Sequence, residues 1–241
     1  MAWNNQTVAS TQTTVDAGLR AYMNRVYALM SLGIAFTAIV TYVVASTPAL
    51  LEPIAMGPMK WVFFAGLLGM GFIAPNIIMT KSRMAAGIAF WVYCALWGLM
   101  MAPMIAYFLQ SQQGAYDIAR AFLITSIMFG SASMYGYVTK KDLSAMGRFL
   151  MMAGIGLLVA IIVNIFVGSS MLSLCISALV VLFSAGVTAY ETQMIRNMYY
   201  QLPTGGAVSR FAILGAFMLY GSFVSMFIHI LNMLAILRGS E

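Results

Sequence analysis

One long apolar run ends, just before Arg196, with the stretch Ser184-Ala185-Gly186-Val187-Thr188-Ala189-Tyr190-Glu191-Thr192-Gln193-Met194-Ile195. This stretch places an acid, Glu191, inside a membrane or at its edge. An acid at the centre of a membrane helix costs about 2.5–3.5 kcal/mol, and less near the interface, so a tolerated one is a functional candidate. The alternative is that Glu191 only extends to the lipid headgroups. The other five acids fall in predicted tails or loops: Asp16, Glu52, Asp117, Asp142 and Glu241.

Composition places the whole chain in a membrane. Of its 241 residues 62% are hydrophobic and 7% charged, with a mean hydropathy of +0.92, whereas soluble chains are about 25% charged. The net charge of +6 does not indicate a nucleic-acid partner. The basic residues stand singly or in pairs between apolar runs, which is the pattern of membrane anchoring. Cys94 and Cys175 lie inside apolar runs and have no metal-ligand spacing.

Seven apolar runs are long enough to cross a bilayer as helices, which takes about 20 residues. They cover residues 26–45, 61–79, 85–109, 118–138, 149–167, 171–195 and 211–237. Continuous runs favour helices over the alternating strands of a barrel. The sequence therefore predicts an all-α membrane protein, with a seven-helix domain over residues 20–241 and a flexible cytoplasmic tail over residues 1–19. Residues 46–60 should lack regular structure, and residues 197–209 should form the longest cytoplasmic loop.

The distribution of basic residues predicts the orientation of the bundle. Nine lysines and arginines fall at ends expected to be cytoplasmic, against Lys60, Arg120 and Arg238 on the other side. Cytoplasmic loops carry the excess of positive charge. The N-terminus should therefore be cytoplasmic and the C-terminus outside, with Glu191 near the cytoplasmic end of the sixth span.

The last span carries a polar stripe. Its members are spaced i, i+3, i+7 and i+10 and lie on one side of a helix: Ser222, Ser225, His229 and Asn232. In lipid such a stripe should face other helices or water. Asn164 and Asn76 are candidate partners. His229 is either a neutral imidazole bonded to a neighbouring helix or a second titrating group on the same pathway as Glu191.

Enzyme chemistry is not expected from these residues. Ser222 and His229 are seven residues apart on one helix, ~10.5 Å along its axis, which is too far for a nucleophile and its base. The chain has no HExxH sequence for a metalloprotease. All four lysines lie at helix ends, so none is placed to bind retinal. No cofactor is expected.

Several segments together resemble the Bax-inhibitor family, the TMBIM and YccA group of membrane proteins. The strongest is Tyr135-Gly136-Tyr137-Val138-Thr139-Lys140-Lys141-Asp142-Leu143-Ser144-Ala145-Met146-Gly147, and Val163-Asn164-Ile165-Phe166 follows it. The element Thr188-Ala189-Tyr190-Glu191-Thr192-Gln193 is similar to the family's Ala-Tyr-Asp-Thr-Gln. Leu219-Tyr220-Gly221-Ser222-Phe223 stands where the family usually has Leu-Tyr-Leu-Asp-Phe.

The resemblance implies a fold and a function. Six helices are expected to surround the seventh, and the activity is expected to be a slow, proton-sensitive leak of calcium or other cations. Two acids on the last two helices are thought to share a proton and latch the cytoplasmic side. Glu191 matches one of them and Ser222 replaces the other, so this chain lacks the second acid of the family's pH switch. By residue count Ser222 lies ~18 Å beyond Arg210, while Glu191 is only ~7.5 Å before Arg196, so the pairing rests on the resemblance.

Any calcium site here should be weak, because calcium takes six to eight oxygen ligands and Glu191 is the one acid available. The alternative function is non-enzymatic. The YccA branch resembles regulators of the membrane protease FtsH, and a flexible tail of residues 1–19 would suit engagement by that machine. Both functions place the chain in a bacterial inner membrane, in contact with the lipid bilayer.

Overall fold

The computed structural model describes the backbone of residues 3–201 and 207–238 and the side chains of residues 17–201 and 208–238. Eight helices follow one another: α1 (Trp3–Ala45), α2 (Pro48–Ala55), α3 (Met59–Thr80), α4 (Arg83–Leu109), α5 (Gly114–Val138), α6 (Ser144–Val167), α7 (Ser170–Gln201) and α8 (Ala207–Arg238). Seven of them are long and apolar enough to cross a membrane, and α2 is the exception. This confirms the predicted all-α class and the seven spans.

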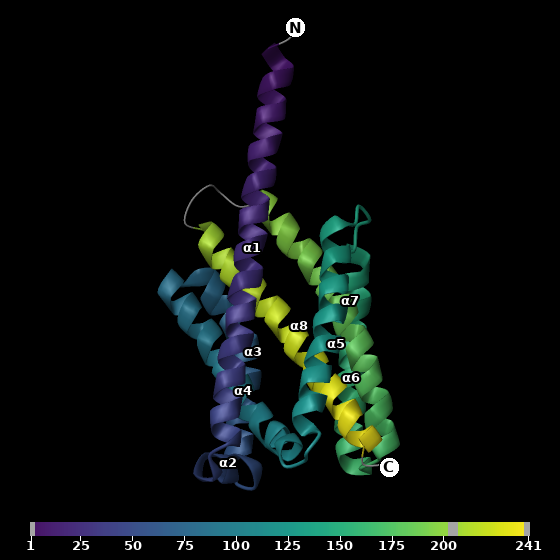
Figure 1. The fold of residues 1–241 in the computed structure, drawn as a ribbon. Coiled ribbons are helices and arrows are strands. Elements are labelled where there is room, and N and C mark those ends of the chain that lie inside the picture. The colour runs from purple at the N-terminus through teal and green to yellow at the C-terminus, as the bar shows by residue number, and fades with distance from the viewer. Residues whose placement is uncertain (1–2, 202–206, 239–241) are drawn as a thin grey trace.

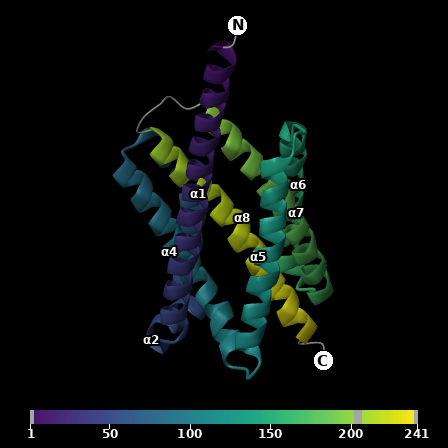
Figure 2. The ribbon, with the colours of Figure 1, turned by 45° about the horizontal axis from the view of Figure 1, so that its top comes forward.

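The last helix is central. α8 crosses the bundle diagonally between α1, α3 and α4 on one side and α5, α6 and α7 on the other (Figure 1), and the same diagonal is seen in the turned view of Figure 2. In its most apolar 18-residue stretch 72% of the residues are buried, against at most 39% in any other span. It packs on α1, α3, α4, α5 and α7, while α6 packs only on α7 in the described residues. The predicted central position of the last helix is confirmed, but in the described part of the chain five of the six other spans pack on it directly and α6 does not.

Aromatic side chains fix α8 against the first group. The rings of Phe217 and Tyr93 have centroids 4.5 Å apart. Tyr220 is fully buried, and its hydroxyl lies 2.6 Å from that of Thr37 on α1. A buried tyrosine needs a hydrogen-bond partner for its hydroxyl, and Thr37 provides one. α6 shows the opposite pattern: only 6% of its most apolar stretch is buried, because a span can present its apolar side chains to lipid.

The prediction that residues 46–60 lack regular structure is wrong. Residues 48–55 form α2, which begins with Pro48. Proline is tolerated in the first turn, where its missing N–H has no helical partner to lose. Ile54 is buried in a small apolar cluster with Val44 and Ala102. This packing stabilises the short helix although Pro53 lies inside it.

Two other expected boundaries differ from the structure. α1 begins at Trp3 and continues into the first span, so no break in the helix separates residues 3–19 from residues 20–45. The flexibility of residues 1–19 stays a prediction. The loop expected at 197–209 is shorter, because α7 continues to Gln201 and α8 starts at Ala207. Residues 202–206 of that loop lie outside the described residues.

α5 and α7 meet at a glycine. A Cβ atom added to Gly136 would lie 2.1 Å from the carbonyl oxygen of Ala189 and 2.9 Å from its Cα. These are backbone atoms and cannot rotate away. Glycine at this position therefore lets the two backbones approach closely, as small residues do in membrane bundles.

We predict that Gly136→Ala destabilises the bundle by about 1–3 kcal/mol, the usual cost of overpacking. Gly130→Ala on the same helix is the matched control, because a Cβ there meets nothing within 4 Å. That control should be neutral or stabilising, since alanine favours a helix over glycine. The measurement is unfolding in mixed detergent micelles. Equal effects of the two substitutions would contradict the close contact.

The loops and chain termini lie at the two ends of the bundle in the alternation that the sequence analysis expected. In Figure 1 the N-terminus, the α3–α4 turn and the α5–α6 loop lie at one end, and the C-terminus lies at the other. We predict that a C-terminal reporter active only outside the cytoplasm is active, and that a cytoplasmic reporter at the same place is silent. The reverse result would invert the orientation or remove one span.

Candidate functional site

Glu191 and Ser222 are in direct contact. The Ser222 hydroxyl on α8 donates a hydrogen bond to Glu191 Oε2 on α7 at 2.7 Å. Ser222 is buried and Glu191 is half-buried. The residue count suggested different depths for the two. They meet because α8 crosses the bundle obliquely (Figure 1) and because α7 continues past Arg196 to Gln201.

The rest of the α8 stripe also faces α7, residue by residue. Ser184 Oγ lies 3.3 Å from Ser225 Oγ. Farther along, Ser177 Oγ lies 3.2 Å from Nδ1 of His229 and accepts a hydrogen bond from Nδ2 of Asn232 at 2.9 Å. Polar side chains in a bundle form such bonds across helices because lipid offers no partner.

The partners on α7 were not singled out as a set by the sequence analysis. Ser177, Ser184 and Glu191 are spaced seven residues apart, close to two helical turns, so they share one face. Ser173 lies one turn before them and contacts Asn232 at 3.3 Å. The signal in the sequence was a polar residue at every seventh position of an otherwise apolar span. It predicts the helix that α8 would pair with.

The two asparagines proposed as partners do not join the stripe. Asn164 lies on α6, which packs on α7 and not on α8. Its side-chain oxygen is buried without a hydrogen-bond partner. Asn76 on α3 is exposed. Asn164 and Asn76 were proposed only because they are polar residues within apolar runs. Serines of α7 bond to the α8 stripe instead.

A cavity of about 300 Å³ lies beside the Glu191–Ser222 contact. Five of the side chains that line it carry oxygen, and apolar residues including Phe183 and Phe217 complete its wall; the five are Tyr93, Ser184, Glu191, Ser222 and Ser225. Calcium usually takes six to eight oxygen ligands. Five oxygen-bearing side chains with a single carboxylate suit weak, transient contact with a cation. The described residues contain no cluster of three or more His, Cys, Asp or Glu that could hold a metal.

The same segment of α7 holds the α5–α6 loop. Gln193 accepts a hydrogen bond from the N–H of Leu143 and donates one to the carbonyl of Lys141, both at 2.8 Å. Arg196 donates to the carbonyls of Tyr137 and Thr139. Within the loop, the hydroxyl and N–H of Ser144 donate to Asp142 and lower the pKa of that carboxyl.

At the far end of the bundle Asp117 is buried in the first turn of α5. The expectation that it falls in a loop is therefore wrong. Its Oδ2 atom lies 3.1 Å from Arg238, the last residue of α8, and Arg238 also donates to Ser111 at 2.8 Å. This ion pair explains how a second acid is tolerated near the membrane edge, because its charge has a partner.

The fold and site define a seven-span membrane protein with a central last helix. The family described as "Inhibitor of apoptosis-promoting Bax1" matches residues 19–239. The chain is 34% identical to the inner membrane protein YbhL of Escherichia coli (strain K12), over 90% of this chain and 92% of the relative. It is 37% identical to an uncharacterised protein of Deinococcus radiodurans, over 96% and 97% of the two chains.

This chain therefore belongs to the Bax-inhibitor family. The two segments that carried the resemblance pack on each other. Gly136 of the first lies against Ala189 of the second, and a Cβ on Gly147 would lie 2.7 Å from the ring of Tyr190.

We predict that Ser177→Ala destabilises the bundle by about 1 kcal/mol, since interhelical hydrogen bonds in membranes average about 0.6 and reach about 1.7 kcal/mol. Ser177 contacts both His229 and Asn232. Ser131→Ala is the control, because that exposed hydroxyl bonds only its own helix at Ile127. The readout is unfolding in mixed micelles. A cost no greater than that of the control would mean that the stripe contributes no stability.

Proposed function

We propose that this protein is a slow, poorly selective leak for calcium or other cations across a bacterial inner membrane. The Glu191–Ser222 contact is its latch. The supporting observation is a carboxylate bonded across the two most closely associated helices, beside a cavity with five oxygen-bearing side chains. The N-terminus is assigned to the cytoplasm from the basic residues, which puts the latch near the cytoplasmic side.

The latch works through charge. Hydrogen bonds to ionised groups are about twice as strong as neutral ones, so ionised Glu191 holds Ser222 and α8 firmly. A proton or a cation on the carboxylate weakens that bond. Beyond the latch, polar pairs continue along the α7–α8 interface to His229 and Asn232. We call this line of polar contacts the seam. It supports a route for ions between the two helices once they separate.

We assign no catalytic role to the seam. Ser177 contacts His229, but Ser177 is only 1% exposed and accepts a hydrogen bond from Asn232. A substrate would have to enter between two packed helices to reach it. No resident cofactor is proposed. Calcium is treated as the transported ion, with weak binding at Glu191.

We predict that the flux depends on pH through Glu191 alone, and less steeply than in a relative with two acids. Two carboxylates held close cannot both be charged, and Ser222 does not supply that repulsion. Glu191→Gln should abolish the pH response, because it keeps the shape and removes the titrating proton. Ser222→Asp should steepen the response. Purified protein in vesicles, assayed for calcium flux from about pH 5 to 8, provides the test.

Ser222→Ala should raise the flux at neutral pH by about ten- to a hundredfold, since a hydrogen bond to a charged group contributes about 1.5–3 kcal/mol. Glu52→Gln is the control for removal of an acid, because Glu52 is exposed on α2, far in sequence from the seam. An unchanged pH profile in Glu191→Gln would transfer the sensor role to His229. Absence of flux above that of empty vesicles would favour the alternative function, a regulator of the protease FtsH.

A further inference from the structure

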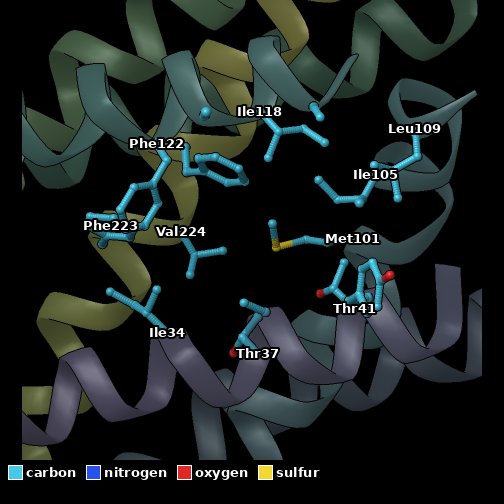
Figure 3. A pocket seen from close by; sticks show the side chains of 15 residues that line it. Ile34, Thr37, Thr41, Met101, Ile105, Leu109, Ile118, Phe122, Phe223 and Val224 are labelled. Atoms are coloured by element: carbon cyan, nitrogen blue, oxygen red, sulfur yellow. The ribbon is translucent and has the colours of Figure 1, made fainter. Parts of the chain in front are cut away.

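A second cavity, of about 460 Å³, lies on the other side of α8. Its walls come from α1 and α5, and its floor from α4 and α8. In Figure 3 Ile118 and Phe122 of α5 point into it opposite Thr37 of α1, with Met101 of α4 and Val224 of α8 between them. It exists because the backbones of α1 and α5 do not pack directly in the described part of the chain.

The lining of this cavity is almost entirely apolar, and the hydroxyl groups of its two threonines are already paired. None of the residues that line it is charged. Thr37 donates to the carbonyl of Cys94 and Thr41 to that of Gly98, both at 3.0 Å. Ordered water needs two or more polar partners, and ions need more, so neither fits this cavity. An apolar chain does.

The mouth of the cavity opens sideways within the spans. Small residues, Ala38 of α1 and Ala119 of α5, lie on the two rims and are exposed. Phe122 and Tyr42 beside them are 47% and 63% exposed. All four belong to spans, where the surrounding solvent is the hydrocarbon of the bilayer. Val224 and Met101 on the floor are only 3% and 8% exposed.

We propose that this cavity is a lipid site that takes one acyl chain of a bilayer phospholipid through the gap between α1 and α5. Its volume lies in the range of specific ligand pockets, about 300–1,000 Å³. The chain would contact Phe223 and Val224, which follow Ser222 directly in sequence. Ser222 faces α7 and Val224 faces the cavity, so the lipid and the latch occupy different faces of the same helix. The inference is independent of the proposed function.

The experiment uses the full-length protein in vesicles that contain a phosphatidylglycerol with a photoreactive diazirine in the middle of one acyl chain. After irradiation, adducts are located by peptide mass spectrometry. We expect adducts on Met101 and Val224 as well as on exposed residues such as Ile155 of α6 (62% exposed). Lipid that only surrounds the protein reaches Ile155 and does not reach the cavity floor. Adducts confined to exposed positions would overturn the proposal.

A variant that closes the mouth of the cavity gives a second test of the proposal. Ala119→Trp should remove the adducts on Met101 and Val224 and leave those on Ile155. The matched control is Ala35→Trp, since Ala35 is an exposed alanine of α1 outside the cavity lining, and it should change neither set. Persistence of the floor adducts in Ala119→Trp would refute entry between α1 and α5. If that variant does not fold, the adduct map of the unaltered protein still decides the proposal.

Discussion

The absence of water around the spans is the constraint on which this structure depends. A polar side chain in hydrocarbon must find its partner on another helix. α8 carries four such residues on one side, and α7 offers Ser173, Ser177, Ser184 and Glu191 in matching order. Pairing them sets the register of the two helices. It also removes α8 from the lipid, because the face opposite the stripe packs on the aromatic residues of α4 and on Thr37 of α1.

Central placement of α8 divides the remaining spans into two groups that touch each other little. α1 and α5 are separated on one side of α8, and α4 and α7 on the other. Each separation leaves a cavity against α8, but the two differ in chemistry. The α4–α7 side exposes Glu191 and three serines, whereas the α1–α5 side exposes aliphatic and aromatic side chains. The difference follows from the helical repeat, since Ser222 and Val224 point about 200° apart around the axis.

The sequence was enough to predict the seven spans and the inward polar stripe, because hydrocarbon allows few alternatives for long apolar runs and for polar residues within them. It was not enough to predict which polar residues pair. Asn164 and Asn76 are as polar as Ser177, and only the packing of α6 away from α8 excludes the first. Residue counting placed Ser222 deeper than Glu191, since counting assumes helices parallel to the membrane normal. The helix α2 was missed because its prolines were taken only as helix breakers, although Pro48 occupies a position that favours one.

The contacts at the two ends of α8 limit how the latch that we propose could work. Near its start, Arg210 donates to the carbonyls of Met79 and Lys81 at the end of α3, at 3.3 and 3.0 Å. At its end, Arg238 pairs with Asp117 of α5. The basic group at the C-terminus of α8 is also favoured by the helix dipole. With both ends tied to different helix groups, loss of the Glu191–Ser222 bond does not free α8 to leave the bundle. In the leak that we propose, opening would therefore be a local separation of α7 from α8 at Glu191, with both ends of α8 held in place.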